Sequence, residues 1–97
     1  MPIYVTLAQF TDQGIRNIKE APQRAEANAK LGATFGVKLL GAYYTMGEYD
    51  MVAIIEAEDE QLATAGLLVL GTQGNVKTTT MRAFSPAEFA EIVKKMP

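Results

Sequence analysis

The stretch that decides the fold is residues 37–57, which read VKLLGAYYTMGEYDMVAIIEA. Two runs rich in apolar, β-branched and aromatic residues, 37–45 and 51–57, flank the segment MGEY at 46–49. Strand-like runs joined by a short, glycine-containing turn are typical of a β-hairpin. The stretch therefore predicts two adjacent antiparallel strands.

The chain before the hairpin predicts one strand followed by helix. Residues 3–10, IYVTLAQF, are β-branched and aromatic in the manner of a strand. The segment TDQG at 11–14 supplies a helix cap, and Pro22 divides the following helical stretch into a short first piece and a second piece ending near Phe35. Gly36 suits the position just after that helix.

The chain after the hairpin repeats this pattern in the opposite order. Asp59 caps a helix that we expect to end at Gly71 and Gly74, and residues 76–84 alternate as a strand. The segment SPAE at 85–88 offers a serine cap, a proline at the first helical position and a capping-box glutamate, which predict a C-terminal helix. The order βαββαβ predicts one α+β, ferredoxin-like domain over residues 1–97, with a terminal helix added.

Both faces of the predicted sheet carry apolar residues. Right-handed crossovers would place the strands at 3–10 and 51–57 in the centre of the sheet, and the first of these has apolar side chains on both sides: Ile3, Val5 and Leu7 on one, Tyr4, Ala8 and Phe10 on the other. A sheet covered by helices on one face only should alternate between apolar and polar residues. We therefore expect a second copy to pack sheet against sheet, which gives a dimeric α/β barrel. The alternative is a monomer in which the terminal helix folds over the sheet.

Composition excludes several classes of function. Nine Lys and Arg residues against eleven Asp and Glu residues give a net charge of −2, which is no electrostatic footprint for nucleic acid or an acidic membrane. The chain has no His and no Cys, so we expect no transition-metal site, no cofactor and no triad chemistry. Without a signal peptide or a membrane-spanning apolar run, we expect a cytoplasmic location.

Several segments together resemble the GYD domain family. They are YVTL at 4–7, TDQGIRN at 11–17, GEYD at 47–50, GNVKT at 74–78 and RAFS at 82–85. The resemblance covers nearly the whole chain and implies a small bacterial or archaeal protein that forms a dimeric α/β barrel. It implies no reaction, cofactor or catalytic residue. The hairpin also resembles, mainly in architecture, the corresponding turn of effector-sensing domains in Lrp/AsnC-type regulators, although this chain lacks their helix-turn-helix domain.

The hairpin rim gathers the densest group of polar and aromatic side chains. Phenols and carboxylates there are candidates for lining a ligand pocket, because tyrosine combines a flat apolar body with a polar tip. The residues concerned are Tyr43, Glu48, Tyr49 and Asp50. The alternative interpretation is turn chemistry, with Gly47 shaping the turn and Asp50 accepting backbone N–H groups.

Arg82 is the candidate charged contact. It lies in the last strand among threonines, where a guanidinium binds an anionic ligand or pairs with a carboxylate such as Glu48 or Glu56.

Two functions remain open from the sequence. The first is a homo-oligomeric protein that binds a small molecule, with Arg82 favouring an anionic one, in a cleft between the sheet and its helices. The second is a cofactor-independent enzyme like the monooxygenases and isomerases built on the same barrel, in which Glu48, Asp50, Glu56 or a tyrosine acts as the general base. A buried carboxylate facing a closed pocket would favour the enzyme.

Overall fold

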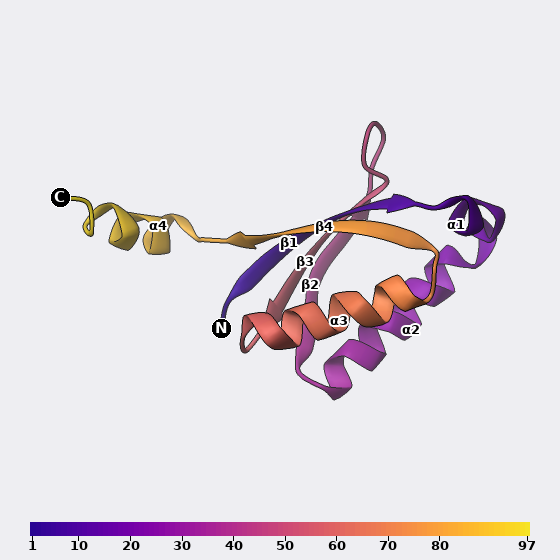
Figure 1. Cartoon of the computed structure of the whole chain (residues 1–97), viewed down its shortest axis with the longest axis horizontal. Coiled ribbons are helices and arrows are strands. Elements are labelled where there is room, and N and C mark those ends of the chain that lie inside the picture. The colour runs from indigo at the N-terminus through magenta and orange to yellow at the C-terminus, as the bar shows by residue number, and fades with distance from the viewer.

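The computed structural model describes residues 1–97 and contains the predicted elements in the predicted order. The four strands form one antiparallel sheet in the order β2-β3-β1-β4, so the first and third strands are central, as the crossover argument predicts. Two long helices, α2 and α3, lie on one side of this sheet (Figure 1). The elements are β1 (Ile3–Phe10), α1 (Asp12–Arg16), the 3-10 helix η1 (Ile18–Glu20), α2 (Ala21–Thr34), β2 (Val37–Tyr44), β3 (Met51–Ala57), α3 (Glu60–Thr72), β4 (Val76–Ala83) and α4 (Pro86–Val93).

Local capping signals account for where α1 and α3 begin. The Thr11 hydroxyl accepts the Gly14 N–H at 3.1 Å, and the Asp59 carboxylate accepts the Leu62 N–H at 2.9 Å. Helix α3 ends at Thr72, between the two glycines that the sequence predicts to end it, and the Gly74 N–H donates to the Gly71 carbonyl oxygen at 3.1 Å. The chain turns only at Gly74, whose φ of +78° is a backbone conformation that residues other than glycine rarely adopt.

The protein core lies between the sheet and the two long helices, and it is thin. Only 11 of 97 residues are buried, and no large side chain is completely buried, so a single copy encloses little apolar volume. Val37 lies where α2 and α3 approach the sheet: a Cβ on Gly32 would lie 3.1 Å from the Val37 carbonyl oxygen, and one on Gly66 would lie 3.4 Å from Val37 Cγ2. Glycines at these two positions let both helices pack directly on the strand.

The opposite side of the sheet has no helix on it. The burial pattern of β1 alternates, with Tyr4, Thr6 and Ala8 buried under the helices and their neighbours only half-buried on the other side. Strand register extends this second side across the sheet, because residues that face each other on paired strands share a side. We call it the open face, and it consists mainly of Ile3, Val5, Leu7, Tyr43, Val52, Ile54 and Met81. The sequence prediction of two apolar faces is confirmed.

Helix α4 does not cover the open face. It extends from the end of β4 away from the rest of the molecule (Figure 1), and every residue from Phe84 to Pro97 is exposed. The alternative in which the terminal helix folds over its own sheet is therefore wrong. No helix combines the length and the apolar character that crossing a bilayer requires.

Candidate functional site

The β2–β3 hairpin is fixed to β1 through Asp50. The carboxylate of Asp50 accepts the Phe10 N–H at 2.8 Å, while the Asp50 N–H donates to the Ala8 carbonyl oxygen at 2.8 Å. Within the loop, the Thr45 hydroxyl donates to the Tyr49 carbonyl oxygen at 2.6 Å, and Gly47 has a φ of +105°. Asp50 and Gly47 thus both have structural roles, although Asp50 accepts its N–H from β1 and not from the turn.

The hairpin exposes aromatic and apolar side chains at its far end. Tyr43 is 68% exposed and Met46 is 98% exposed, while the Tyr44 ring stacks on Phe10 with 6.5 Å between centroids. Tyr49 is half-buried, and the Glu48 side chain points to solvent. Figure 1 shows the hairpin projecting beyond the sheet, so this end of the molecule is a narrow tip, and Tyr44, Met46 and Glu48 are exposed on it.

Arg82 lies at the opposite end of the sheet from the hairpin loop. It faces Tyr4 near the start of β1, whereas the first residue of β3 after the loop, Met51, faces Ala8. Four residues of strand separate these positions, which corresponds to about 13 Å along β1. The structure brings Tyr43, Glu48, Tyr49 and Asp50 into one segment and leaves Arg82 apart from them.

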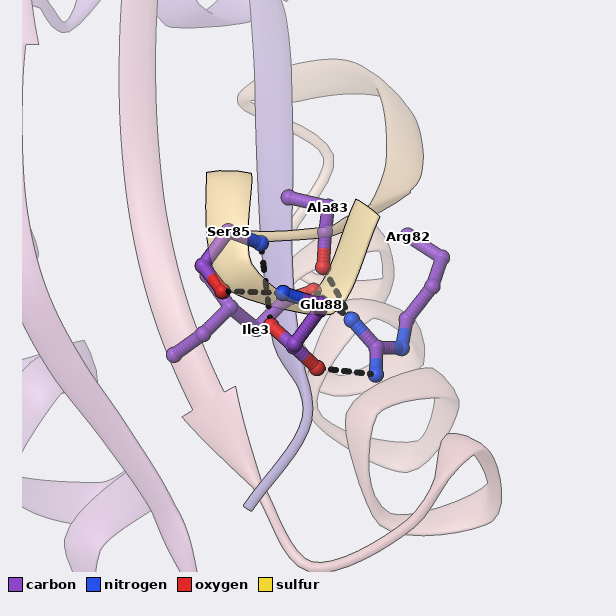
Figure 2. Close-up of polar contacts among 5 residues, drawn as sticks. All are labelled: Ile3, Arg82, Ala83, Ser85 and Glu88. Atoms are coloured by element: carbon purple, nitrogen blue, oxygen red, sulfur yellow. Dashed lines mark hydrogen bonds and ion pairs between the residues drawn. The ribbon is translucent and has the colours of Figure 1, made fainter. Parts of the chain in front are cut away.

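The charge of Arg82 is already engaged within the chain. Figure 2 shows its guanidinium donating to the carbonyl oxygens of Ile3 and Ala83 and pairing with the Glu88 carboxylate at 3.6 Å. The guanidinium carbon also lies 4.5 Å from the centroid of the Phe84 ring, a cation–π distance. The prediction that Arg82 forms an ion pair is confirmed, but its partner is Glu88 and not Glu48 or Glu56.

The surroundings of Arg82 are acidic. It borders an open hollow whose other lining residues are Pro2, Tyr4, Glu58, Asp59, Glu60 and Gln61. Three carboxylates beside one engaged guanidinium do not favour an anionic ligand.

The most apolar hollow is partly open and lies between the helices and the sheet, where the sequence predicts a cleft, but none of the five predicted site residues lines it. It is a cavity of about 140 Å³. Small residues make this space, because Ala25, Ala29 and Gly32 recur at helical spacing on the side of α2 that lines it. That spacing is visible in the sequence, but it does not reveal how far the helices stand from the sheet. The lining residues are Thr6, Ala25, Asn28, Ala29, Leu31, Gly32, Phe35, Val37, Leu39, Ala42, Met51, Ala53, Ile55, Gly66, Leu67, Val69 and Leu70.

The two polar side chains at the cavity have partners within the chain. Asn28 exchanges two hydrogen bonds with Gln73, at 2.8 and 3.2 Å, and the Thr6 hydroxyl is 2.9 Å from that of Thr80. No carboxylate or cationic side chain lines the space. The cavity therefore suits a small uncharged apolar molecule, and no residue in it has the chemistry of a general base.

Comparison with solved structures supports the fold. The structure of FFRP-DM1 superposes with a TM-score of 0.62 at 17% identity, covering 87% of this chain and all of that one. The structure of TTHA0845 from Thermus thermophilus superposes with a TM-score of 0.52 at 24% identity, covering 88% of this chain and 95% of that one. At these identities the likeness shows a shared fold and nothing more.

Comparison of sequences shows the family. The GYD domain matches over residues 4–93. A Thermus thermophilus protein, the glutamine synthetase and cystathionine beta-lyase binding protein, is 35% identical over 95 residues, which cover 97% of this chain and all of that relative. Since both matches extend over almost the whole chain, the protein belongs to the GYD domain family.

Proposed function

We propose that this GYD domain protein is a homo-oligomeric binding protein whose partners are other proteins, metabolic enzymes among them. The observation that carries the proposal is the full-length relative that is 35% identical and is named for binding two enzymes. Matching over the full length means that the relative has no additional domain to which its binding could be assigned.

The hairpin tip is the surface that we assign to the partner. Protein interfaces are enriched in tyrosine and methionine and depleted in charge at their centre. Tyr44 and Met46 provide these side chains, and both are more than half exposed, whereas Tyr43 belongs to the open face. Asp50 holds the hairpin to β1, so the tip is presented on a fixed support.

Binding can be tested with glutamine synthetase and cystathionine beta-lyase from the organism that encodes this chain. Sedimentation velocity of each enzyme mixed with the protein should show a complex at micromolar concentrations. Met46→Ser combined with Tyr44→Ser should weaken the complex at least about tenfold, because a few anchors carry most of an interface's energy. The matched control is Leu68→Ser, which removes a similarly exposed apolar side chain from α3.

Absence of a complex with both enzymes at about 50 micromolar, well above the dissociation constants of typical specific complexes, would refute their assignment as partners. Equal weakening by the control would refute the hairpin assignment.

The homo-oligomer is proposed from the open face. Contiguous exposed apolar surface of this extent is unusual on a monomer, and no element of the same chain covers it. A second copy packing sheet against sheet would bury the same residues from both copies.

A second candidate function, small-molecule binding, is favoured by the cavity under α2 and α3. An apolar cavity of this order is large enough for a benzene-sized molecule. We therefore propose an uncharged apolar ligand there in place of the anionic ligand expected from Arg82. The enzyme alternative gains no support from the cavity, since no carboxylate lines it.

Methyl NMR with benzene and with acetate as probes separates these ligand classes. Benzene should shift the methyl signals of Ile55 and Leu67, and Ala29→Leu, which fills the cavity, should abolish the shifts. Ala27→Leu on the exposed side of α2 is the control. Backbone amide signals of Arg82 and the hairpin tyrosines that shift on adding acetate, without any methyl shift on adding benzene, would instead restore the site expected from the sequence.

A further inference from the structure

Helix α4 has an apolar stripe that nothing in its own chain covers. Phe89, Ile92 and Val93 recur at the i, i+3 and i+4 positions that share one side of a helix, and Met96 follows just after the helix ends; we call these four residues the α4 stripe. They are 37–69% exposed. An eight-residue helix is too short to be stable in water by itself, so its stability has to come from packing against something else.

The chain holds α4 away from its own open face. Only Phe84 and Ser85 separate β4 from α4. At this junction the Ser85 N–H donates to the Glu88 carboxylate at 2.9 Å, and the same carboxylate pairs with Arg82, as Figure 2 shows. These contacts attach the first turn of α4 to the end of the sheet in an outward direction.

The charge pattern of α4 argues against a lipid surface as the occupant. Its polar side and C-terminal turn carry Glu88, Glu91, Lys94 and Lys95, two acidic and two basic residues, and Glu91 pairs with Lys94 at 3.0 Å. Interfacial membrane helices carry an excess of basic residues on the polar side. A protein surface with exposed apolar residues fits this balanced helix better.

The area of the open face argues for a second copy as that surface. Strands of about eight residues at about 3.3 Å per residue, spaced about 4.8 Å apart, give a four-stranded face of about 500 Å². A standard specific interface buries about 800 Å² on each partner. Helix α4, which we call the arm, has eight residues and is therefore about 12 Å long and about 10 Å wide. In a dimer, each copy would bury its own arm and contact the arm of the other copy. Together these contacts would add about 240 Å² per copy, which brings the total close to the standard size.

We propose that the α4 arm packs its stripe on a second copy of the chain, so that two arms exchanged across the two-fold axis clamp a sheet-to-sheet dimer. The inference rests on the proposed homodimer and deepens it. The arm and the open face are two unpartnered apolar surfaces of one molecule, and a symmetric pair covers both at once.

Sedimentation equilibrium of full-length variants tests the arm. The combined change Phe89→Ser and Ile92→Ser should raise the dimer dissociation constant at least about tenfold. The reason is that both arms of the dimer lose two apolar side chains from the interface. Glu91→Gln, on the polar side of the same helix, should leave the dissociation constant within about twofold, as expected for an exposed ion pair.

Isotope-filtered NOE spectroscopy on the wild type gives an independent readout. In a mixture of labelled and unlabelled protein, the Phe89 ring should show NOEs to methyl groups of the other copy. A wild-type dimer whose dissociation constant is unchanged by the stripe variant, or whose Phe89 contacts are all within one copy, overturns the arm and leaves the homodimer standing. A wild-type monomer at about 100 micromolar, far above the dissociation constant of a standard-sized interface, overturns both proposals.

Discussion

Asp50, a candidate ligand-binding residue in the sequence, has a structural role in the folded protein. Its carboxylate accepts the Phe10 N–H at 2.8 Å in a partly buried position, so the hairpin is tied to the central strand by a charge-assisted hydrogen bond. Glu48, two residues earlier in the loop, has an exposed side chain. Its backbone carbonyl oxygen accepts a hydrogen bond from the side-chain amide of Gln9 at 3.0 Å. The two acidic residues of the rim therefore have different importance for stability.

Substitution of these two residues should separate their roles. Asp50→Ala leaves the Phe10 N–H without its acceptor and should lower the free energy of unfolding by about 1–3 kcal/mol. Glu48→Ala should change it by less than about 0.5 kcal/mol, as expected for an exposed side chain. Urea denaturation followed by circular dichroism measures both. Equal effects of the two changes would show that the Asp50 hydrogen bond contributes nothing.

Gly14 is required by a close approach between α1 and the start of β4. A Cβ at this position would lie well inside the van der Waals contact distance of the Asn75 carbonyl oxygen, and backbone cannot move aside as a flexible side chain can. Gly14→Ala should therefore destabilise the protein by about 2–3 kcal/mol, at the upper end of the usual cost of overpacking.

Gly71 provides the matched control for this change. It lies inside α3 with nothing within 4 Å of the added Cβ. Gly71→Ala should stabilise the protein by about 0.5–1 kcal/mol through helix propensity. Thermal unfolding of both variants gives the comparison, and a neutral Gly14→Ala would mean that α1 moves away from β4 at little cost.

The residues that the sequence predicted best are those whose partners are close in the chain. The caps at Asp59 and Ser85 bond to groups three residues further on, so spacing alone identifies them. The Glu88 partner of Arg82 was missed although it is only six residues away. Their meeting depends on the direction in which α4 leaves the strand, and no local pattern encodes that direction.

At the scale of elements, the start of α4 is sensitive to pH. The Ser85 N–H, which donates to the Glu88 carboxylate, lowers the pKa of Glu88 below its ordinary value of 4.5, and the Ser85 hydroxyl and the Arg82 guanidinium lower it further. A carboxyl whose pKa is lower in the folded state stabilises that state above the unfolded pKa. The stabilisation is lost as the pH falls through the lowered value.

The expected result is that α4 frays at acidic pH before the sheet unfolds. Carbon-13 secondary shifts of residues 86–93 should lose helical character as the pH falls below about 4.5, whereas those of β1 should not change in this range. Glu88→Gln keeps a capping-box side chain without a titrating group, so its α4 shifts should be independent of pH. Identical pH profiles in both proteins would rule out Glu88 as the titrating group.

The elements, their order and the place of a cleft between the sheet and its helices could be predicted from the sequence, but the residues that line the cavity could not. The strands and helices follow from periodicity, caps and turns, each read over a short local window. The cavity depends on the distance at which α2 and α3 rest on the sheet, and contacts such as that of Gly66 with Val37 set this distance between residues far apart in the sequence. Long-range packing of this kind leaves no periodic trace.

At the scale of the whole molecule, the single copy is elongated and has a thin core. Its longest dimension is 51 Å and its shortest is 18 Å, and 11 of its 97 residues are buried. The two apolar faces of the sheet were predicted from the alternation in β1, and the structure confirms that one of them is uncovered. Stability that a compact domain obtains from its own core is then expected to come from association.

Association of this kind makes thermal stability depend on concentration. If the folded protein is a dimer through the open face, unfolding is coupled to dissociation, and the Tm should rise with protein concentration.

Val5 is at the centre of that face, opposite Ile54 on β3 and Met81 on β4. Val5→Asp would place a carboxylate in the apolar contact, which is costly because no cation faces it there, and it should abolish the concentration dependence and give the mass of a monomer by light scattering. Gln23→Asp, on an exposed position of α2, introduces the same charge without touching the sheet and should retain the wild-type dependence. A wild-type Tm that is constant from about 1 to about 100 micromolar would show that the open face is left exposed to solvent, and the homo-oligomer would have to be abandoned.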